Sequence, residues 1–247
     1  IGNVVGSNIF NVLGILGITA IFFPIAVDRK NMRFELPLCI FVSVLLLLLT
    51  FNCFNGSASS LARLDGILLL LVFALYILYS FARDRKEAAV AADNGDGGSL
   101  WKAVLKVVGG LALLITSCDF FVDNAVSVAK SFGVDNAFIS LTLIACGTSL
   151  PELAASVAAA IKKNTDMALG NIVGSNIFNI TLILGLSSQV MPLTSSGITY
   201  IDYIVMIAAA VLLFVIGLFG RIGRLSGLLM FICFVLYNWY LVSNQMA

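Results

Sequence analysis

The sequence predicts an all-α integral membrane protein, and two observations lead to this class. Apolar residues make up 60% of the 247 residues and charged residues only 11%, whereas about a quarter of the residues in soluble domains are charged. The apolar residues also form continuous runs close to the ~20 residues that a helix needs to cross the hydrocarbon layer of a bilayer. A transmembrane barrel would instead show alternating segments of about ten residues.

Eight membrane-spanning helices are expected from these runs, with polar joints between them. In chain order they cover residues 4–24, 36–53, 66–82, 103–129, 137–161, 170–191, 201–220 and 223–243. The chain begins at Ile1 rather than at Met, directly at a sequence motif, so we expect it to be a fragment of a longer protein.

The joints carry Lys and Arg very unequally. If the spans alternate in direction, twelve of the fourteen Lys and Arg residues fall on one side, and only Arg63 and Lys130 fall on the other. Because short cytoplasmic joints are enriched in Lys and Arg, the first side is predicted to be cytoplasmic. The longest joint, 83–102, lies on that side and is charged and Gly-rich. It is predicted to be a linker between a first half, 1–82, and a second half, 103–247.

One decapeptide occurs twice in nearly the same form. "GNVVGSNIFN" at Gly2–Asn11 returns as "GNIVGSNIFN" at Gly170–Asn179, 168 residues later. Extended to sixteen positions from the first glycine, 12 of 16 residues are identical. In the alternating topology, the first copy runs from outside to inside and the second from inside to outside. Opposite insertion of two copies is typical of inverted-topology repeats in secondary transporters, whose sites lie near the membrane midplane.

Each copy places a serine and an asparagine four residues apart, as Ser7 with Asn11 and as Ser175 with Asn179. Residues at i and i+4 share a helix face, so each copy can present a hydroxyl and an amide oxygen to a hard cation such as Ca²⁺ or Na⁺. In a single copy, these side chains would more simply be helix-packing residues. Their duplication in opposite orientation favours a binding role. The other two asparagines of the repeat lie off this face and are interpreted as packing residues: Asn8 and Asn176.

A second motif, "ACGTSLPEL" at Ala145–Leu153, interrupts a hydrophobic span. Pro151 has no N–H and clashes with the preceding turn, so the carbonyl of Gly147 loses its helical partner. Irregular backbone at membrane depth is tolerated where it lines a cavity or is buried in protein. Broken helices of this kind coordinate ions in transporters.

An acid directly follows the proline of this motif. Glu152 has no Lys or Arg nearby in its own span, and an unpaired intramembrane carboxylate indicates a functional site by default. Ser149 and Thr148 lie three and four residues before Glu152 and can share its helix face. We therefore expect this motif to supply one acid and two hydroxyls to a cation site.

Other candidate chemistry is weaker. Asp119 and Asp123, at i and i+4, could form a cation vestibule, a proton-titrating pair or a polar helix contact, and hydration at the outer interface favours a structural role. An intramembrane aspartyl protease is a further alternative, but it would need its two acids on separate helices. Asp119 and Asp123 are neighbours on one expected helix, which argues against it. The chain has no histidine, and its five cysteines show no CxxC spacing, which argues against zinc, haem and His-based catalysis. The expectation is a transporter without a cofactor, not an enzyme.

The quoted motifs resemble those of a known family. "GTSLPEL" followed by "DMALGNIVGSNIFNITLILG" is similar to the second α-repeat of the calcium:cation antiporter superfamily, the sodium/calcium exchangers and their prokaryotic relatives. "GNVVGSNIFNVLGILG" resembles the end of the first α-repeat. The family has ten transmembrane helices in two inverted five-helix halves. The resemblance therefore implies that this chain holds helices three to ten, and that the missing helices carry the first-repeat counterpart of "GTSLPEL" with its acid.

The resemblance also implies a cation site at mid-membrane, with Glu152 as the principal ligand of Ca²⁺ and Na⁺. The further ligands that it implies come from the same broken helix and from both repeat copies: Thr148, Ser149, the carbonyl of Ala145, Ser175, Asn179, Ser7 and Asn11. In such a site three Na⁺ exchange for one Ca²⁺. Charge neutralisation by the acids links the two ions.

The residues leave the coupling ion open between Na⁺ and H⁺. Some relatives, including the potassium-dependent branch, carry Asp where this chain has Asn179, and the neutral amide leaves less titratable charge for proton coupling. Sodium is the expectation, and a Ca²⁺/H⁺ or other divalent cation/proton antiporter is the alternative. The resemblance further implies a bacterial inner membrane with the linker 83–102 in the cytoplasm. The partners are then the lipid bilayer and the two ions, and a monomer is compatible with this reading.

Overall fold

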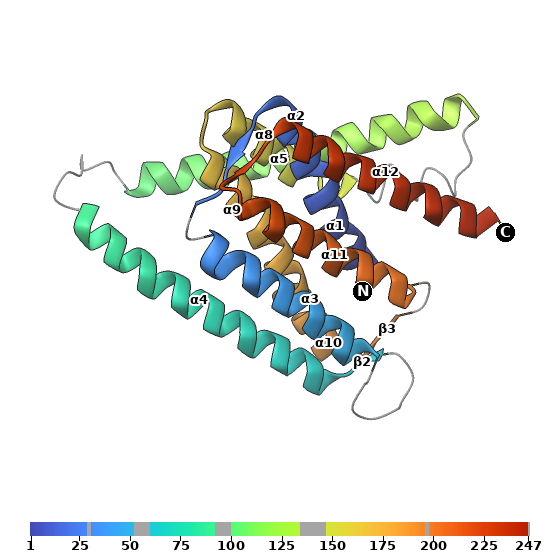
Figure 1. The fold of residues 1–247 in the computed structure, drawn as a ribbon, viewed down its shortest axis with the longest axis horizontal. Coiled ribbons are helices and arrows are strands. Elements are labelled where there is room, and N and C mark those ends of the chain that lie inside the picture. The colour runs from blue at the N-terminus through green and yellow to red at the C-terminus, as the bar shows by residue number, and fades with distance from the viewer. Residues whose placement is uncertain (29–30, 52–59, 92–99, 134–146, 196–197, 247) are drawn as a thin grey trace. The chain divides into compact units, whose positions relative to one another are not determined.

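The structure, a computed structural model, describes residues 1–28, 31–51, 60–91, 100–133, 147–195 and 198–246. The chain divides into two compact units. One unit consists of Ile1–Leu70 together with Glu152–Ala247, and the other of Leu71–Pro151. Figure 1 traces the elements along the chain, and both copies of the repeated decapeptide belong to the first unit.

Seven helices within the described ranges are long and apolar enough to cross a membrane. They are Gly2–Phe22, Asn31–Thr50, Arg63–Arg83, Val104–Ser131, Thr165–Val190, Tyr200–Gly217 and Arg224–Ser243. These match seven of the eight spans expected from the sequence. Of the remaining span, 137–161, residues 137–146 lie outside the described residues, and the rest contains a helix of 12 residues. The molecule is thus an all-helical integral membrane protein.

The N-terminal part of the first unit contains one interrupted helix, a second helix and two short strands. In order these are α1 (Gly2–Ile9), the π-helix η1 (Phe10–Leu16), α2 (Gly17–Phe22), β1 (Ile25–Ala26), the π-helix η2 (Asn31–Glu35), α3 (Leu36–Thr50) and β2 (Ser60–Leu61). Pro37 lies near the start of α3, just after η2.

The C-terminal part repeats this order. Its elements are α8 (Leu150–Ile161), α9 (Thr165–Phe178), the π-helix η5 (Asn179–Ile183), α10 (Leu184–Val190), β3 (Leu193–Thr194), α11 (Tyr200–Gly217), β4 (Arg221–Ile222) and α12 (Arg224–Met246). A capping box starts α11, because Thr199 accepts from the backbone of Asp202 while the Asp202 carboxylate accepts from the backbone of Thr199. Such a box satisfies N–H groups that the first turn would otherwise leave unpaired.

Two long helices, α4 (Arg63–Ala91) and α5 (Leu100–Ser131), supply most of the second unit. The sequence predicted that the linker begins at residue 83, but α4 continues through residues 83–91. This stretch reads RDRKEAAVA, and Ala, Arg, Lys and Glu are among the best helix formers. Residues 92–99 of the linker lie outside the described ranges.

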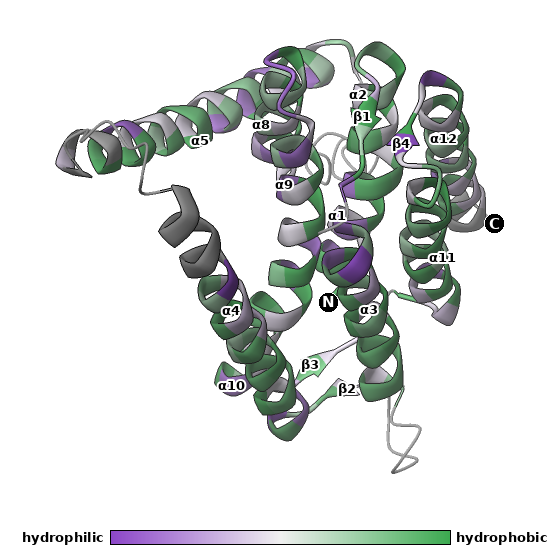
Figure 2. Cartoon of the chain, turned by 60° about the vertical axis from the view of Figure 1, so that its left-hand side comes forward, coloured by the Kyte–Doolittle hydropathy of each residue, from purple (hydrophilic) through white to green (hydrophobic). Residues whose placement is uncertain are grey.

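The repeated segments occupy the interior of the first unit. The α1–η1 segment contacts α11, α12 and α9, and α9 also packs on α3. Most residues of Gly2–Phe22 are buried, whereas few of Arg224–Ser243 are. Figure 2 shows that α4 and α11 are hydrophobic along most of their length. Apolar side chains are exposed on α4 and on α12, such as Leu75 and Leu236, and are suited to contact lipid.

Two short antiparallel strand pairs join residues far apart in the chain. Strand β1 pairs with β4, with Ile25 opposite Ile222. Strand β2 pairs with β3, with Leu61 opposite Leu193. Strands β1 and β3 follow the two repeat copies at the same distance, because Ile25 and Leu193 are 168 residues apart, the spacing of the repeat itself.

Glycines allow two close helix crossings in the first unit. A Cβ on Gly227 of α12 would lie 2.7 Å from the carbonyl oxygen of Gly17, and a Cβ on Gly66 of α4 would lie 2.9 Å from that of Gly185. Gly17 and Gly185 are equivalent positions of the two repeat copies. Small residues let membrane helices approach closely, so the same crossing occurs after each copy.

Candidate functional site

Both repeat copies change from α- to π-helix near the end of the decapeptide. In the first copy α1 gives way to η1 at Phe10, and in the second α9 gives way to η5 at Asn179. A π-helical turn is wider than an α-helical turn and often marks a functional site. Asn11 is the second residue of η1, and Asn179 is the first residue of η5. The two predicted asparagine ligands therefore both lie where the helix widens.

Four asparagines, two from each copy, form one hydrogen-bonded cluster between the repeat segments. Asn11 Nδ2 donates to Asn176 Oδ1 over 3.0 Å, and Asn179 Nδ2 donates to Asn8 Oδ1 over 3.2 Å. Asn8 Nδ2 donates to the carbonyl oxygen of Asn176 over 3.3 Å, and Asn176 Nδ2 donates to that of Asn8 over 3.2 Å. The cluster ties residues together that are at least 165 positions apart.

This cluster has an internal two-fold pattern. A shift of 168 residues converts Asn8 into Asn176 and Asn11 into Asn179. The four bonds form two pairs, one between side chains and one from side chain to backbone carbonyl. Exchanging each residue for its equivalent in the other copy converts one bond of a pair into the other. Each copy thus makes the same contacts to its counterpart that it receives in return.

The buried environment makes these bonds important. Asn8, Asn11 and Asn176 are 1%, 0% and 2% exposed, and Asn179 is half-buried. Within the described residues, Asn11 Oδ1 has no hydrogen-bond partner, and leaving a buried acceptor unpaired costs roughly 1–3 kcal/mol. An amide oxygen held in this way is available to a cation.

The predicted acid, Glu152, lies in the first turn of α8. Pro151 is the second residue of this helix, a position that tolerates a residue without an N–H. The sequence placed this proline inside a span. The structure shows that residues 148–149 form a turn immediately before α8, so the helix breaks just ahead of Glu152.

A third asparagine of the second copy links α8 to α9. Asn171 Nδ2 donates to the carbonyl oxygen of Glu152 over 3.3 Å and to Ser156 Oγ over 3.0 Å. Asn171, Ser175 and Asn179 follow one another at intervals of four residues and so share a face of the helix. The face that carries the predicted Ser175 and Asn179 ligands is therefore the face that holds α8 at Glu152.

For the remaining predicted ligands, the structure gives the burial of the side chain and the compact unit to which it belongs. Ser7 lies half-buried on α1, four residues before Asn11. Thr148 is exposed and Ser149 is buried, and both belong to the second compact unit. Ala145 lies outside the described residues. Asp119 and Asp123 are exposed on α5.

No cluster of three or more His, Cys, Asp or Glu side chains able to hold a metal occurs among the described residues.

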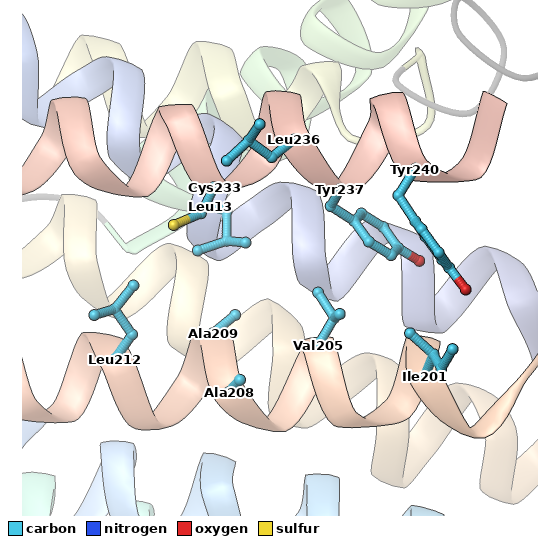
Figure 3. Close-up of a pocket in the computed structure, with 10 residues that line it drawn as sticks. All are labelled: Leu13, Ile201, Val205, Ala208, Ala209, Leu212, Cys233, Leu236, Tyr237 and Tyr240. Carbon is cyan, nitrogen blue, oxygen red and sulfur yellow. The ribbon is translucent and has the colours of Figure 1, made fainter. Parts of the chain in front are cut away.

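A separate cavity of about 440 Å³ lies between α11 and α12, beside Leu13 of η1 (Figure 3). None of the described residues that line it is charged. Tyr237 lines one end of the cavity, and its hydroxyl donates to Asp202 Oδ1 over 2.7 Å. The apolar walls suit hydrocarbon rather than a hard cation, which prefers oxygen ligands.

Sequence reasoning missed two features of this site. It assigned Asn8 and Asn176 to helix packing, but they also hydrogen-bond the side chains of the predicted ligands Asn179 and Asn11. It also gave no role to Asn171. The available signal was the repeat itself, because Asn8 and Asn176 are among the identical positions and a buried amide requires partners.

Known proteins share both the sequence and the fold. The family model described as sodium/calcium exchanger protein matches residues 1–82 and 102–243. CaxA of Alkalimonas amylolytica, a protein named as an antiporter, is 36% identical over 256 residues, which cover 99% of this chain and 78% of CaxA. The sodium/calcium exchanger MaX1 of Methanosarcina acetivorans is 44% identical over 107 residues, covering 43% of this chain and 31% of MaX1.

A solved structure of the sodium-calcium exchanger NCX_Mj superposes with a TM-score of 0.77 at 27% identity, and the match covers 95% of this chain and 74% of that one. The fold, the broken helix with its acid and the paired asparagine motifs thus coincide with sequence similarity along nearly the whole chain. The chain belongs to the sodium/calcium exchanger protein family.

Proposed function

We propose that this chain forms most of an antiporter that exchanges Na⁺ for Ca²⁺ across a membrane by alternating access. The observation that carries the proposal is the asparagine cluster, in which two copies of one motif meet with their predicted ligand residues hydrogen-bonded across the contact. Two nearly identical motifs that face each other can present one site to either side of a membrane.

Three independent features support an inverted repeat with halves 1–82 and 103–247. The cluster bonds map onto each other under a shift of 168 residues. The strand after the first copy, β1, pairs with β4, as the strand after the second copy, β3, pairs with β2. The close glycine crossing recurs at Gly17 and Gly185. A repeat with this symmetry can interconvert outward- and inward-facing forms by exchanging the roles of its halves.

The proposed site combines Glu152 with the oxygens of Ser7, Asn11, Ser175 and Asn179. Thr148, Ser149 and the carbonyl of Ala145 complete the ligand set inferred from the sequence. Ca²⁺ and Na⁺ are both hard cations that accept such oxygens. They compete for one site because the same limited negative charge must neutralise either one Ca²⁺ or several Na⁺.

Na⁺ rather than H⁺ is the proposed coupling ion. Apart from Glu152, the side-chain ligands proposed here are neutral hydroxyls and amides, which coordinate Na⁺ but do not titrate near neutral pH. A Ca²⁺/H⁺ antiporter of the same architecture remains the second candidate, because Glu152 itself can carry a proton in an apolar environment.

The proposal is tested by flux in vesicles. The complete protein is reconstituted into proteoliposomes, and ⁴⁵Ca²⁺ uptake is measured under an outward Na⁺ gradient or, separately, under a pH gradient. We expect uptake with the Na⁺ gradient alone, and loss of uptake in Glu152→Gln, which removes the charge but keeps the shape. The matched control is Asp166→Asn, which removes the charge of an exposed acid in the first turn of α9. Uptake driven only by the pH gradient would move the assignment to proton coupling.

A further inference from the structure

An amide ligand has a favourable end and an unfavourable end for a cation. Its oxygen can coordinate a metal ion, whereas its NH₂ group carries partial positive charge and repels one. Rotation by half a turn about the last side-chain bond exchanges the two ends. The affinity of an asparagine ligand therefore depends on what holds its NH₂ group.

In this structure the NH₂ groups of Asn11 and Asn179 are held by the two other asparagines of the repeat. Asn176 Oδ1 accepts from Asn11, and Asn8 Oδ1 accepts from Asn179, over 3.0 and 3.2 Å. Since each NH₂ group is engaged in this way, the oxygen points elsewhere. At Asn11 that oxygen is buried and without a hydrogen-bond partner among the described residues.

Asn8 and Asn176 are themselves fixed. Each donates its own NH₂ group to the other's backbone carbonyl, over 3.3 and 3.2 Å. Met206 Sδ also lies 3.9 Å from Asn8 Nδ2. A flip of either amide would replace an acceptor by a donor and break two bonds at once.

From these contacts we propose that Asn8 and Asn176 are positioning residues that orient the amide oxygens of Asn179 and Asn11 toward the transported cation. Neither residue touches the ion in this scheme, and each acts on the ligand of the opposite repeat copy. The arrangement matches outer ligand partners in metal sites, which fix the orientation of the ligating group. This inference rests on the proposed cation exchange.

The test measures the Ca²⁺ KM and the maximal rate of Na⁺-driven ⁴⁵Ca²⁺ uptake by the complete protein, per mole of folded protein. The variants Asn8→Leu and Asn176→Leu keep the size of the side chain but remove its oxygen and NH₂ group. We expect each to raise the KM about tenfold or more, in line with losses of outer ligand partners. Thr19→Val is the matched control, since it removes another buried polar group of the first repeat segment outside the cluster, and its KM should stay at the wild-type value.

Two further variants separate positioning from packing. Asn8→Ala also removes the amide but adds no apolar branch to the cluster, so its KM should rise in the same way, which keeps the prediction testable even if Asn8→Leu fails to fold. In a double-mutant cycle, Asn8→Leu should raise the KM of Asn179→Leu only slightly. Once the Asn179 amide is absent, Asn8 has no ligand to orient.

The outcomes are distinguishable. A normal KM in folded Asn8→Leu and Asn176→Leu, or fully additive effects of Asn8→Leu and Asn179→Leu on the KM, would overturn the positioning role while Na⁺-driven uptake by the wild type upholds the exchange. Effects confined to the yield of folded protein would also overturn it, because they would show a packing role alone. Absence of Ca²⁺ flux in the wild type under either gradient would remove the exchange and the positioning role together.

Discussion

Asn11 and Asn176 stand 165 residues apart in the chain, and a hydrogen bond of 3.0 Å joins their side chains. The equivalent pair with the copies exchanged, Asn179 and Asn8, is joined in the same way. The two repeat copies are therefore bonded through the residues that the sequence marks as cation ligands and their neighbours. Any change at the site of one copy should be felt by the other.

The two proposed asparagine ligands should contribute similarly to Ca²⁺ binding. Asn11→Leu and Asn179→Leu each remove one amide oxygen, and we expect each to weaken Ca²⁺ binding at least tenfold, about 1.4 kcal/mol. Binding of ⁴⁵Ca²⁺ to the purified complete protein measures this. A large effect at one asparagine and no effect at the other would contradict a shared site.

Asn171 should matter because it holds α8 at Glu152. Asn171→Leu removes both bonds, to the Glu152 carbonyl and to Ser156 Oγ, each worth roughly 0.5–1.5 kcal/mol. We expect slower exchange and a lower unfolding temperature in detergent. Ser156→Ala removes only one of the two bonds and should show a smaller loss of rate. Equal rates for both variants and the wild type would exclude this role for Asn171.

The glycine crossings should tolerate no side chain. Gly227→Val would place a methyl group against the backbone of Gly17, and such overpacking destabilises proteins by roughly 1–3 kcal/mol. A lower thermal unfolding midpoint in detergent is expected. Gly109→Ala on α5 is the control, since a Cβ there meets no described atom within 4 Å. A similar midpoint for both variants would show that the close crossing does not restrict this position.

Asp202 should affect stability but not ion affinity. Its carboxylate accepts from the backbone N–H of Thr199, from the Thr199 hydroxyl and from the Tyr237 hydroxyl. Asp202→Ala removes the carboxylate half of the capping box of α11 and the acceptor of the Tyr237 hydroxyl, and each such hydrogen bond is worth roughly 0.5–1.5 kcal/mol. We expect a lower unfolding midpoint with an unchanged Ca²⁺ KM. A raised KM in folded protein would instead assign this acid to the ion pathway.

Local patterns were sufficient for much of this picture. Continuous apolar runs gave the positions of seven membrane helices, and Pro151 marked the helix break beside Glu152. The reason is that hydrophobic length and a missing N–H act within a few residues of the chain. The duplicated "GSNIFN" segments likewise pointed to Ser7, Asn11, Ser175 and Asn179 before any contact was known.

Long-range contacts were beyond such reasoning. The pairing of Asn8 with Asn179 depends on how two helices 168 residues apart cross, which no local pattern encodes. Asn171 was overlooked for the same reason, since its partners lie on the preceding helix α8. The end of α4 was placed too early because the charges of residues 83–91 suggested a loop, while their helix propensity continued the helix.

The central claim is that both repeat copies and Glu152 form one Ca²⁺ site that Na⁺ also occupies. Isothermal titration of Ca²⁺ into the complete purified protein, with increasing Na⁺, tests it most directly. We predict one Ca²⁺ bound per protein, competitive weakening by Na⁺ with a Hill coefficient above one, and loss of binding in Glu152→Gln. Ca²⁺ binding that persists in Glu152→Gln, or that is insensitive to Na⁺, would contradict the claim.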